Sequence, residues 1–313
     1  MKRILSIVLV VMLFVMVGCG SEPQAKEQKL SKLTIGLMPD TDSIPFIIAA
    51  EYGYFAEEGL EIELIPFKSA MERDAALQSG SLDGAVSDLL AVIFARSGGF
   101  SVYATSYTDG SYNLVAGGNT DIASAADLRG KEIAISRNTI IEYVTDEILA
   151  VNGVGEKDVS KVVIPQIPVR LEMLQSGNLA AAVLPEPMAS VAEFSGSRYV
   201  TGSGDLGINP GVIVFTDSAI KDKEQSIRAM YRAYDKAANY LNNTPRADYI
   251  DLIMERSGFP GPARDALVLK PYRFAGLPAE KDVDEAVRWV KNKGLAGDYR
   301  YDELVSKLLT EGK

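Results

Sequence analysis

Short runs of apolar and β-branched residues alternate with longer stretches of helical spacing along most of the chain. This alternation is typical of an α/β protein. In the first part of the chain it predicts, in order, a strand at 33–37, a helix at 44–54, a strand at 60–67, a helix at 70–79, a strand at 83–86, a helix at 89–97, and strands at 100–107 and 113–116.

The same order of elements then starts again. The pattern predicts a strand at 132–135, a helix at 140–151, a strand at 159–164, a helix at 171–176, a strand at 181–184, a helix at 188–194 and a strand at 198–201. Residues 73–86 also align without gaps on residues 170–183, with eight of the fourteen positions identical. We therefore expect two similar α/β lobes.

A further strand, 211–215, follows the second unit, and the rest of the chain has helical spacing at 223–242, 247–257 and 279–293. A strand at this point predicts that the chain crosses back into the first lobe. The expected first lobe is therefore 32–114 plus 209–313, and the second is 115–208. Two crossing strands would form the hinge between them.

The N-terminus has the layout of a secretory signal peptide over residues 1–18. Lys2 and Arg3 precede an apolar run at 4–17, which is short for a membrane span. A membrane anchor or a buried N-terminal helix is the alternative, although nothing downstream continues the run. The run ends at Cys19, the only cysteine in the chain.

Cys19 resembles the lipobox cysteine of bacterial lipoproteins, although Met16 stands where leucine is usual. The resemblance implies a lipid on Cys19 and a location on the extracytoplasmic face of the cell membrane. A free thiol or an intermolecular disulfide is the alternative. The polar residues that follow predict a flexible tether, so that 19–31 links the lipid to the folded body.

Composition excludes several functions. The formal net charge is −10, which argues against nucleic acid as a partner. The chain contains no histidine and no second cysteine, which excludes histidine- or cysteine-based metal sites and Ser-His-Asp or Cys-His catalysis. We expect no cofactor and no metal.

Three short segments carry a more specific pattern. Residues 42–60 end in Gly-Tyr-Phe-x-x-x-Gly-Leu, residues 77–86 follow Leu-x-x-Gly-x-x-Asp-x-x, and residues 184–187 read Leu-Pro-Glu-Pro. Together they resemble the solute-binding proteins for sulfonates, nitrate and thiamine precursors, over about residues 33–240. The resemblance implies the type II periplasmic-binding-protein fold, a small-molecule ligand and a partner ABC transporter permease.

Ligands of open α/β sheets bind beyond the C-terminal ends of the strands, beside helix N-termini. If the two lobes face each other, the loops at these ends converge on one cleft. The residues expected to bind the ligand are Asp40, Thr41, Asp42, Ser43, Asp88, Tyr107, Asp109, Arg137, Asn138, Thr139 and Glu186.

Some of these residues have structural alternatives. Thr41, Ser43, Asp88 and Thr139 are also plausible helix N-caps. Arg137 is either a ligand clamp or part of an ion pair between the lobes. Glu186 lies between two prolines, cannot sit inside a regular helix and matches the family's Glu-Pro element, so we expect it to contact the ligand.

The candidate loops carry five carboxylates and one arginine. This excess favours a ligand rich in N–H donors, such as a thiamine-precursor aminopyrimidine stacked on tyrosine. A sulfonate, taurine or nitrate anion is the alternative, since helix N-termini can supply donors. An enzyme on the same fold, with Asp40 and Asp42 in acid–base roles, and a surface adhesin are rivals of other classes.

Overall fold

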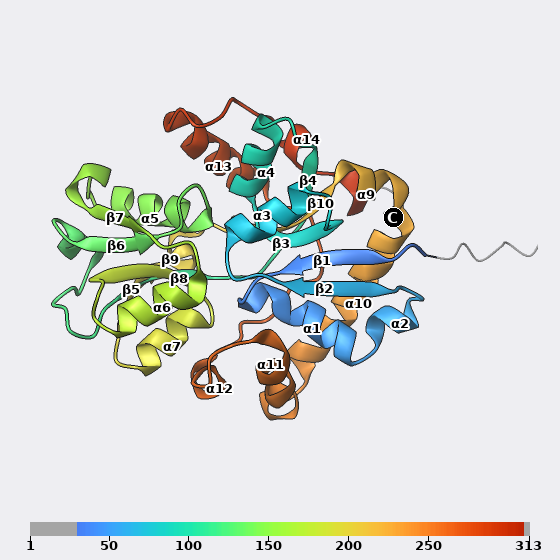
Figure 1. Cartoon of the computed structure of the whole chain (residues 1–313), viewed down its shortest axis with the longest axis horizontal. Helices are drawn as coiled ribbons and strands as arrows, with labels where there is room; N and C mark the ends of the chain where they lie inside the picture. The colour runs from blue at the N-terminus through green and yellow to red at the C-terminus, as the bar shows by residue number, and fades with distance from the viewer. Residues whose placement is uncertain (1–29, 310–313) are drawn as a thin grey trace, which may run out of the picture.

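The computed structural model describes residues 30–309. The predicted signal peptide, Cys19 and most of the tether lie outside these residues. The chain forms two lobes side by side, each built on one sheet with helices packed around it (Figure 1). Among the described residues, no helix combines the length and apolar character needed to cross a membrane.

The first lobe holds a five-stranded sheet in the order β2-β1-β3-β10-β4. Strand β10 runs antiparallel between β3 and β4, whereas β1 is parallel to β2 and β3. Every residue of β3 and β10 is buried, as expected for central strands covered by helices on both faces. The bounds are β1 Leu33–Leu37, β2 Ile62–Pro66, β3 Gly84–Asp88, β4 Val102–Tyr107 and β10 Gly211–Thr216.

The second lobe repeats this topology in the order β7-β6-β8-β5-β9. Strand β5 takes the place that β10 has in the first sheet, antiparallel between its two neighbours. The prediction of two similar α/β lobes is therefore confirmed. The bounds are β5 Tyr112–Ala116, β6 Glu132–Ile135, β7 Ser160–Val163, β8 Ala181–Pro185 and β9 Arg198–Gly202.

The chain crosses between the sheets twice. The first crossing lies between β4 and β5, and the second runs from β9 through the short helix α8 (Ser203–Leu206) to β10. Residue 114, the expected end of the first lobe, lies inside β5, and the whole of that strand pairs with the second sheet. Both crossings lead into a central strand, so the hinge connects the two cores directly.

The helices follow the predicted apolar spacing, with differences at their ends. The helix expected at 171–176 already begins at Ile167, because Pro168 falls in the first turn, where a missing N–H costs nothing. The principal helices are α1 Ile44–Glu51, α2 Tyr54–Glu57, α3 Ala70–Gln78, α4 Leu89–Ser97, α5 Ile140–Val151, α6 Ile167–Gln175, α7 Met188–Phe194, α9 Asp217–Asp222, α10 Glu224–Asn243, α11 Ile250–Ser257, α12 Ala263–Ala266, α13 Glu280–Asn292 and α14 Tyr301–Leu304.

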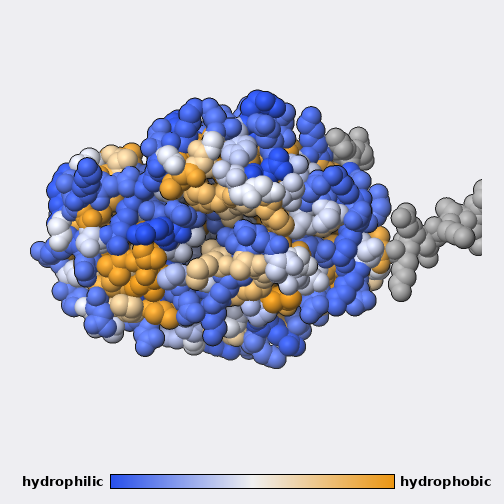
Figure 2. Space-filling view, turned by 45° about the horizontal axis from the view of Figure 1, so that its top comes forward, coloured by the Kyte–Doolittle hydropathy of each residue, from blue (hydrophilic) through white to orange (hydrophobic). Residues whose placement is uncertain are grey.

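The surface is largely hydrophilic on the face that Figure 2 shows, with hydrophobic residues gathered in patches.

The C-terminal helices complete the first lobe: α10 packs on α1, and α13 packs on α4. The lobes also touch directly, because Ile167 at the start of α6 donates its backbone N–H to the Lys68 carbonyl at 3.1 Å. The structure is therefore a closed arrangement of the two lobes.

Candidate functional site

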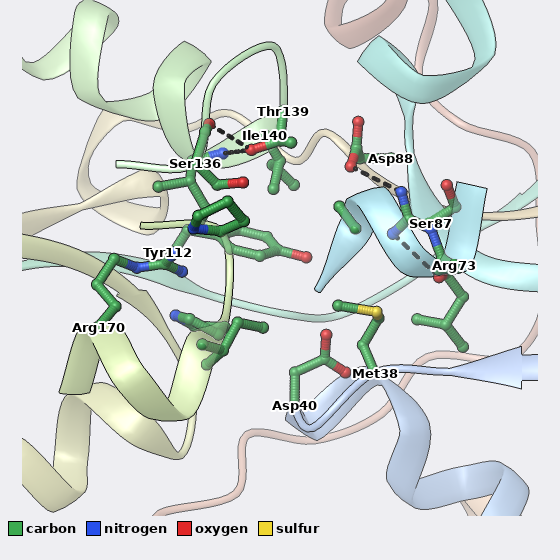
Figure 3. Close-up of a pocket in the computed structure, with 16 residues that line it drawn as sticks. Met38, Asp40, Arg73, Ser87, Asp88, Tyr112, Ser136, Thr139, Ile140 and Arg170 are labelled. Atoms are coloured by element: carbon green, nitrogen blue, oxygen red, sulfur yellow. Dashed lines mark hydrogen bonds and ion pairs between the residues drawn. The ribbon is translucent and has the colours of Figure 1, made fainter. Parts of the chain in front are cut away.

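A cavity lies between the lobes, with about 420 Å³ of empty space when its part open to solvent is included. It is bounded by the C-terminal ends of β1, β3 and β8 and by the first turns of α3, α5 and α6 (Figure 3). This is where ligands are expected in open α/β sheets. Its polar lining consists of Asp40, Arg73, Ser87, Asp88, Tyr112, Ser136, Thr139 and Arg170.

Two buried arginines enter the cavity from opposite lobes. Arg73 on α3 is 3% exposed and Arg170 on α6 is fully buried. Arg73 donates through Nη1 to the Val86 carbonyl at 3.3 Å, and Arg170 donates through Nε to the Val183 carbonyl at 2.9 Å. Both arginines and both valines are aligned partners in the sequence repeat. The repeat therefore places the same cation in both walls of the cavity.

The two arginines differ in their counter-charges. Arg73 Nη2 lies 2.8 Å from Asp74 Oδ1 and 3.6 Å from Asp88 Oδ2. Arg170 donates also to the Ile164 carbonyl at 2.8 Å, but it forms no ion pair with any residue between 30 and 309.

The Nη2 of Arg170 is buried without a hydrogen-bond partner. Burial lowers the pKa of its guanidinium to about 10, so the group stays charged at neutral pH. A buried cation without a counter-ion is costly, and an anion in the cavity would compensate it.

Two carboxyl groups also line the cavity. Asp88 caps α4 by accepting the Ala91 N–H at 2.9 Å; burial raises its pKa, and the charge of Arg73 opposes that rise. Burial raises the pKa of Asp40 well above its usual range, and the neighbouring Asp42 adds to the effect. Burial thus favours the neutral form of Asp40, which is a hydrogen-bond donor.

Neutral donors complete the lining. The first turn of α5 faces the cavity through Ile140 and Ile141, which brings the positive end of the helix dipole to it. Thr139 caps this helix, accepting the Ile141 N–H at 3.2 Å. The hydroxyl of Ser87 is buried without a partner. The cavity therefore offers donors from both lobes to an anion.

Of the predicted site residues, Asp40, Asp88 and Thr139 line this cavity. Asp42 and Ser43 are buried beside it: Asp42 accepts a hydrogen bond from the Tyr112 hydroxyl at 3.0 Å, and Ser43 donates to Asp40 at 3.3 Å. Both brace the cavity wall without lining it.

Thr41, Asp109 and Glu186 line a separate cavity, with about 760 Å³ of empty space. Glu186 accepts a hydrogen bond from the Asn113 side chain at 2.7 Å and from the Ser190 hydroxyl at 2.7 Å, so it ties the first turn of α7 to β5. Asp109 pairs with Arg273. The carboxylates expected to hold one ligand are thus divided between two cavities.

Tyr107, Arg137 and Asn138 line neither cavity. The ring of Tyr107 lies under the Arg273 guanidinium, 3.8 Å from it. Asn138 is exposed and contributes a backbone N–H to Glu142 at 2.7 Å. Arg137 is exposed and forms no ion pair with a described residue, so the structure has no ion pair between the lobes at this position.

Arg73 and Arg170 were absent from the sequence-based site because they lie on helices, away from the loops at the strand ends. The signal was nevertheless present: both begin the repeated segments, at identical positions. An arginine repeated at one position of a duplicated unit, on a buried helix face, indicates a charge held at the meeting point of the two units.

The sequence model of the family described as NMT1/THI5 like matches residues 40–248, well over half of the chain. The chain belongs to the NMT1/THI5-like family. The matched segment includes both arginines and all of the second lobe.

Curated relatives of this NMT1/THI5-like protein carry transport names. A protein of Brachyspira hyodysenteriae named as an ABC transporter periplasmic binding protein is 24% identical over 260 residues, which cover 78% of this chain and 75% of the relative. A Bacillus subtilis protein named as an aliphatic sulfonates-binding protein is 26% identical over 141 residues, 42% of each chain.

Solved structures share the fold. The alkanesulfonate-binding protein SsuA of Xanthomonas axonopodis pv. citri, bound to MOPS, has a TM-score of 0.74 at 17% identity and covers 85% of this chain and 94% of its own. The nitrate-binding protein NrtA of Synechocystis PCC 6803 has a TM-score of 0.78 at 15% identity, covering 90% and 88%. The two-lobed periplasmic-binding-protein fold expected from the sequence is therefore confirmed.

Proposed function

We propose that this protein is the extracytoplasmic solute-binding component of an ABC importer. We further propose that the cavity lined by Arg73 and Arg170, called the central cavity below, holds a small monovalent anion of the sulfonate or nitrate type. The observation that carries the proposal is Arg170, a fully buried guanidinium without a carboxylate partner among the described residues. A bound anion would supply that partner.

The charge balance of the cavity supports a single negative charge on the ligand. Of the charged groups that line the cavity, Asp88 offsets Arg73, and burial favours the neutral form of Asp40. Arg170 then leaves one positive charge in excess. A dianion would remain uncompensated in a buried site, which is unfavourable.

This proposal replaces the aminopyrimidine that the acidic loops had suggested. That argument counted the carboxylates of the loops as one set. In the structure Asp109 pairs with Arg273, and Glu186 accepts bonds from Asn113 and Ser190 outside the central cavity. The names of the relatives, which refer to sulfonates and nitrate, agree with the anion.

Calorimetric titration of the purified protein tests the proposal. Nitrate and ethanesulfonate represent monovalent anions, sulfate represents a dianion, and a hydroxymethyl aminopyrimidine represents the thiamine precursors. We expect one saturable site for a monovalent anion and weaker binding of sulfate. Binding of the aminopyrimidine alone would reject the anion and restore the earlier expectation.

An enzyme is the rival on the same fold, since the desulfurization enzyme DSZB has a TM-score of 0.66 at 14% identity, covering 90% of this chain and 98% of its own. The absence of histidine removes the commonest general base. NMR spectra of ethanesulfonate recorded before and after long incubation with the protein separate the two functions. An unchanged spectrum, together with saturable binding, supports capture without turnover.

A further inference from the structure

Helix α13 reaches from the first lobe to the second. Its apolar side, which includes Val283, Val287 and Val290, is buried where α13 packs on α4 of the first lobe. The C-terminal end of the helix meets α5 of the second lobe through Trp289 and Lys293. α13 therefore contacts both lobes (Figure 1).

The contact centres on Asp146 of α5, whose side chain is 5% exposed. Trp289 donates its indole N–H to Asp146 Oδ2 at 3.1 Å, and Lys293 Nζ lies 2.6 Å from the same oxygen. Lys161 of the second lobe pairs with the other oxygen. The indole also meets the Tyr143 ring edge-on, with 5.8 Å between the ring centroids. The first lobe thus supplies two of the partners of a buried carboxylate in the second.

The contacts around Asp146 also extend to residues 136–139, the loop before α5 that lines the cavity. Glu142 lies one turn before Asp146 on α5, and its Oε1 is 3.7 Å from Lys293. The Oε2 of Glu142 accepts the backbone N–H of Asn138 at 2.7 Å. Asn138 has a φ of 55°, in the left-handed region that favours glycine, so this bond helps to fix a strained backbone. Its neighbours Ser136 and Thr139 line the cavity.

We infer that Trp289 and Lys293 form a latch that holds α5 and the loop before it in the closed arrangement of the lobes. Rotation of the lobes away from each other breaks the bonds to Asp146 and Glu142. The latch therefore stabilises the closed form and slows release of whatever the cavity holds. Its effect on anion release rests on the proposed function, whereas its effect on the lobes does not.

Lys293→Met tests the latch, because methionine keeps an apolar stem and removes the charge. Lys291→Met is the matched control: it lies on the same helix and pairs with Asp298, not with the second lobe. Spin labels at exposed Met71 and Val151, changed to cysteine in a Cys19→Ser background, report the distance between the lobes in the absence of ligand. Stopped-flow mixing measures the dissociation rate of nitrate.

We expect Lys293→Met to shift the label distances toward a more open population and to speed nitrate dissociation roughly ten-fold, as for a lost charged hydrogen bond. Lys291→Met should change neither. If Lys293→Met leaves the label distances as in the unsubstituted protein, the latch is rejected, even if the melting temperature falls. An opened population in a protein that binds no nitrate supports the latch and counts against the proposed function alone.

Trp289→Phe gives a second test in case Lys293→Met does not fold. It keeps an aromatic ring beside Tyr143 and removes only the donor to Asp146. We expect the label distances to shift in the same direction, toward a more open population, but by less than in Lys293→Met. Distances identical to those of the unsubstituted protein overturn the latch.

Discussion

Arg73 and Arg170 occupy one repeated position in the two lobes but have different partners. Arg73 has acidic partners, and Arg170 has only carbonyl oxygens. Arg170→Met should therefore weaken binding of nitrate or ethanesulfonate by roughly ten- to hundred-fold, the range for a charged hydrogen bond. Titration calorimetry measures the dissociation constant, with Arg96→Met as the control remote from the cavity. Equal affinity in Arg170→Met and the unsubstituted protein would remove this residue from the site.

Asp42 predicts a pH dependence of stability. Burial raises its pKa from the ordinary value of 3.8 to about 6, although bonds from Thr108 and Tyr112 oppose the rise. The folded state then binds this proton more tightly than the unfolded state, so the contribution of Asp42 to stability is fully present below pH 4 and is lost as pH rises through 6. The unfolding free energy lost in this way is at most about 3 kcal/mol.

Asp42→Asn removes this titration. Urea unfolding at pH 4 and pH 7 should show that the unsubstituted protein loses more unfolding free energy between these values than the variant does. A parallel pH dependence in the two proteins would mean that Asp42 has an ordinary pKa in the folded state.

Among the elements, the first turn of α5 lines the cavity and is capped by a residue that also lines it. Thr139→Ala removes its N-cap and should cost about 1 kcal/mol of stability. Thr216→Ala removes the cap of α9, where the same bond length of 3.2 Å is found away from the cavity, and should cost about as much. We expect only Thr139→Ala to weaken anion binding in calorimetry as well. Equal anion affinities in the two variants would limit Thr139 to capping.

The elements were predictable where burial alone determines them. Strands β1 and β6 and helices α4 and α5 match the predicted ranges, because apolar spacing there reflects a single buried face or a fully buried strand. The site was less predictable, because the direction of a loop side chain depends on contacts across the fold. Glu186 has the expected place after β8, but Asn113 and Ser190 engage it outside the central cavity.

At the scale of the whole molecule, two lobes joined at two crossings should move as rigid bodies. We expect a monovalent anion that binds at the cavity to favour the closed form. Small-angle scattering should then show a smaller radius of gyration at saturation than without ligand. Sulfate at the same concentration is the control, and an unchanged radius under saturating nitrate or ethanesulfonate would argue against closure by the ligand.

The attachment of the molecule to the membrane is a separate prediction, which concerns residues outside the described range. Cys19 follows an apolar run that ends in Met-Val-Gly, so we expect it to carry a lipid. Cys19→Ser should move the protein from the membrane fraction to the soluble fraction, as shown by fractionation and by mass spectrometry of the N-terminus. A soluble, unlipidated protein before substitution would contradict the anchor.

The indole at the junction of the lobes has a spectroscopic consequence. Trp289 is the only tryptophan in the chain, and its ring lies against Tyr143 with Lys293 above it at 5.1 Å. All the tryptophan fluorescence of the protein therefore originates where the lobes meet. Opening would expose this fluorophore to water and move the Lys293 ammonium away from its ring. Both changes alter the wavelength and intensity of its emission. The protein thus contains its own optical reporter of lobe movement, and screening candidate solutes needs no added dye.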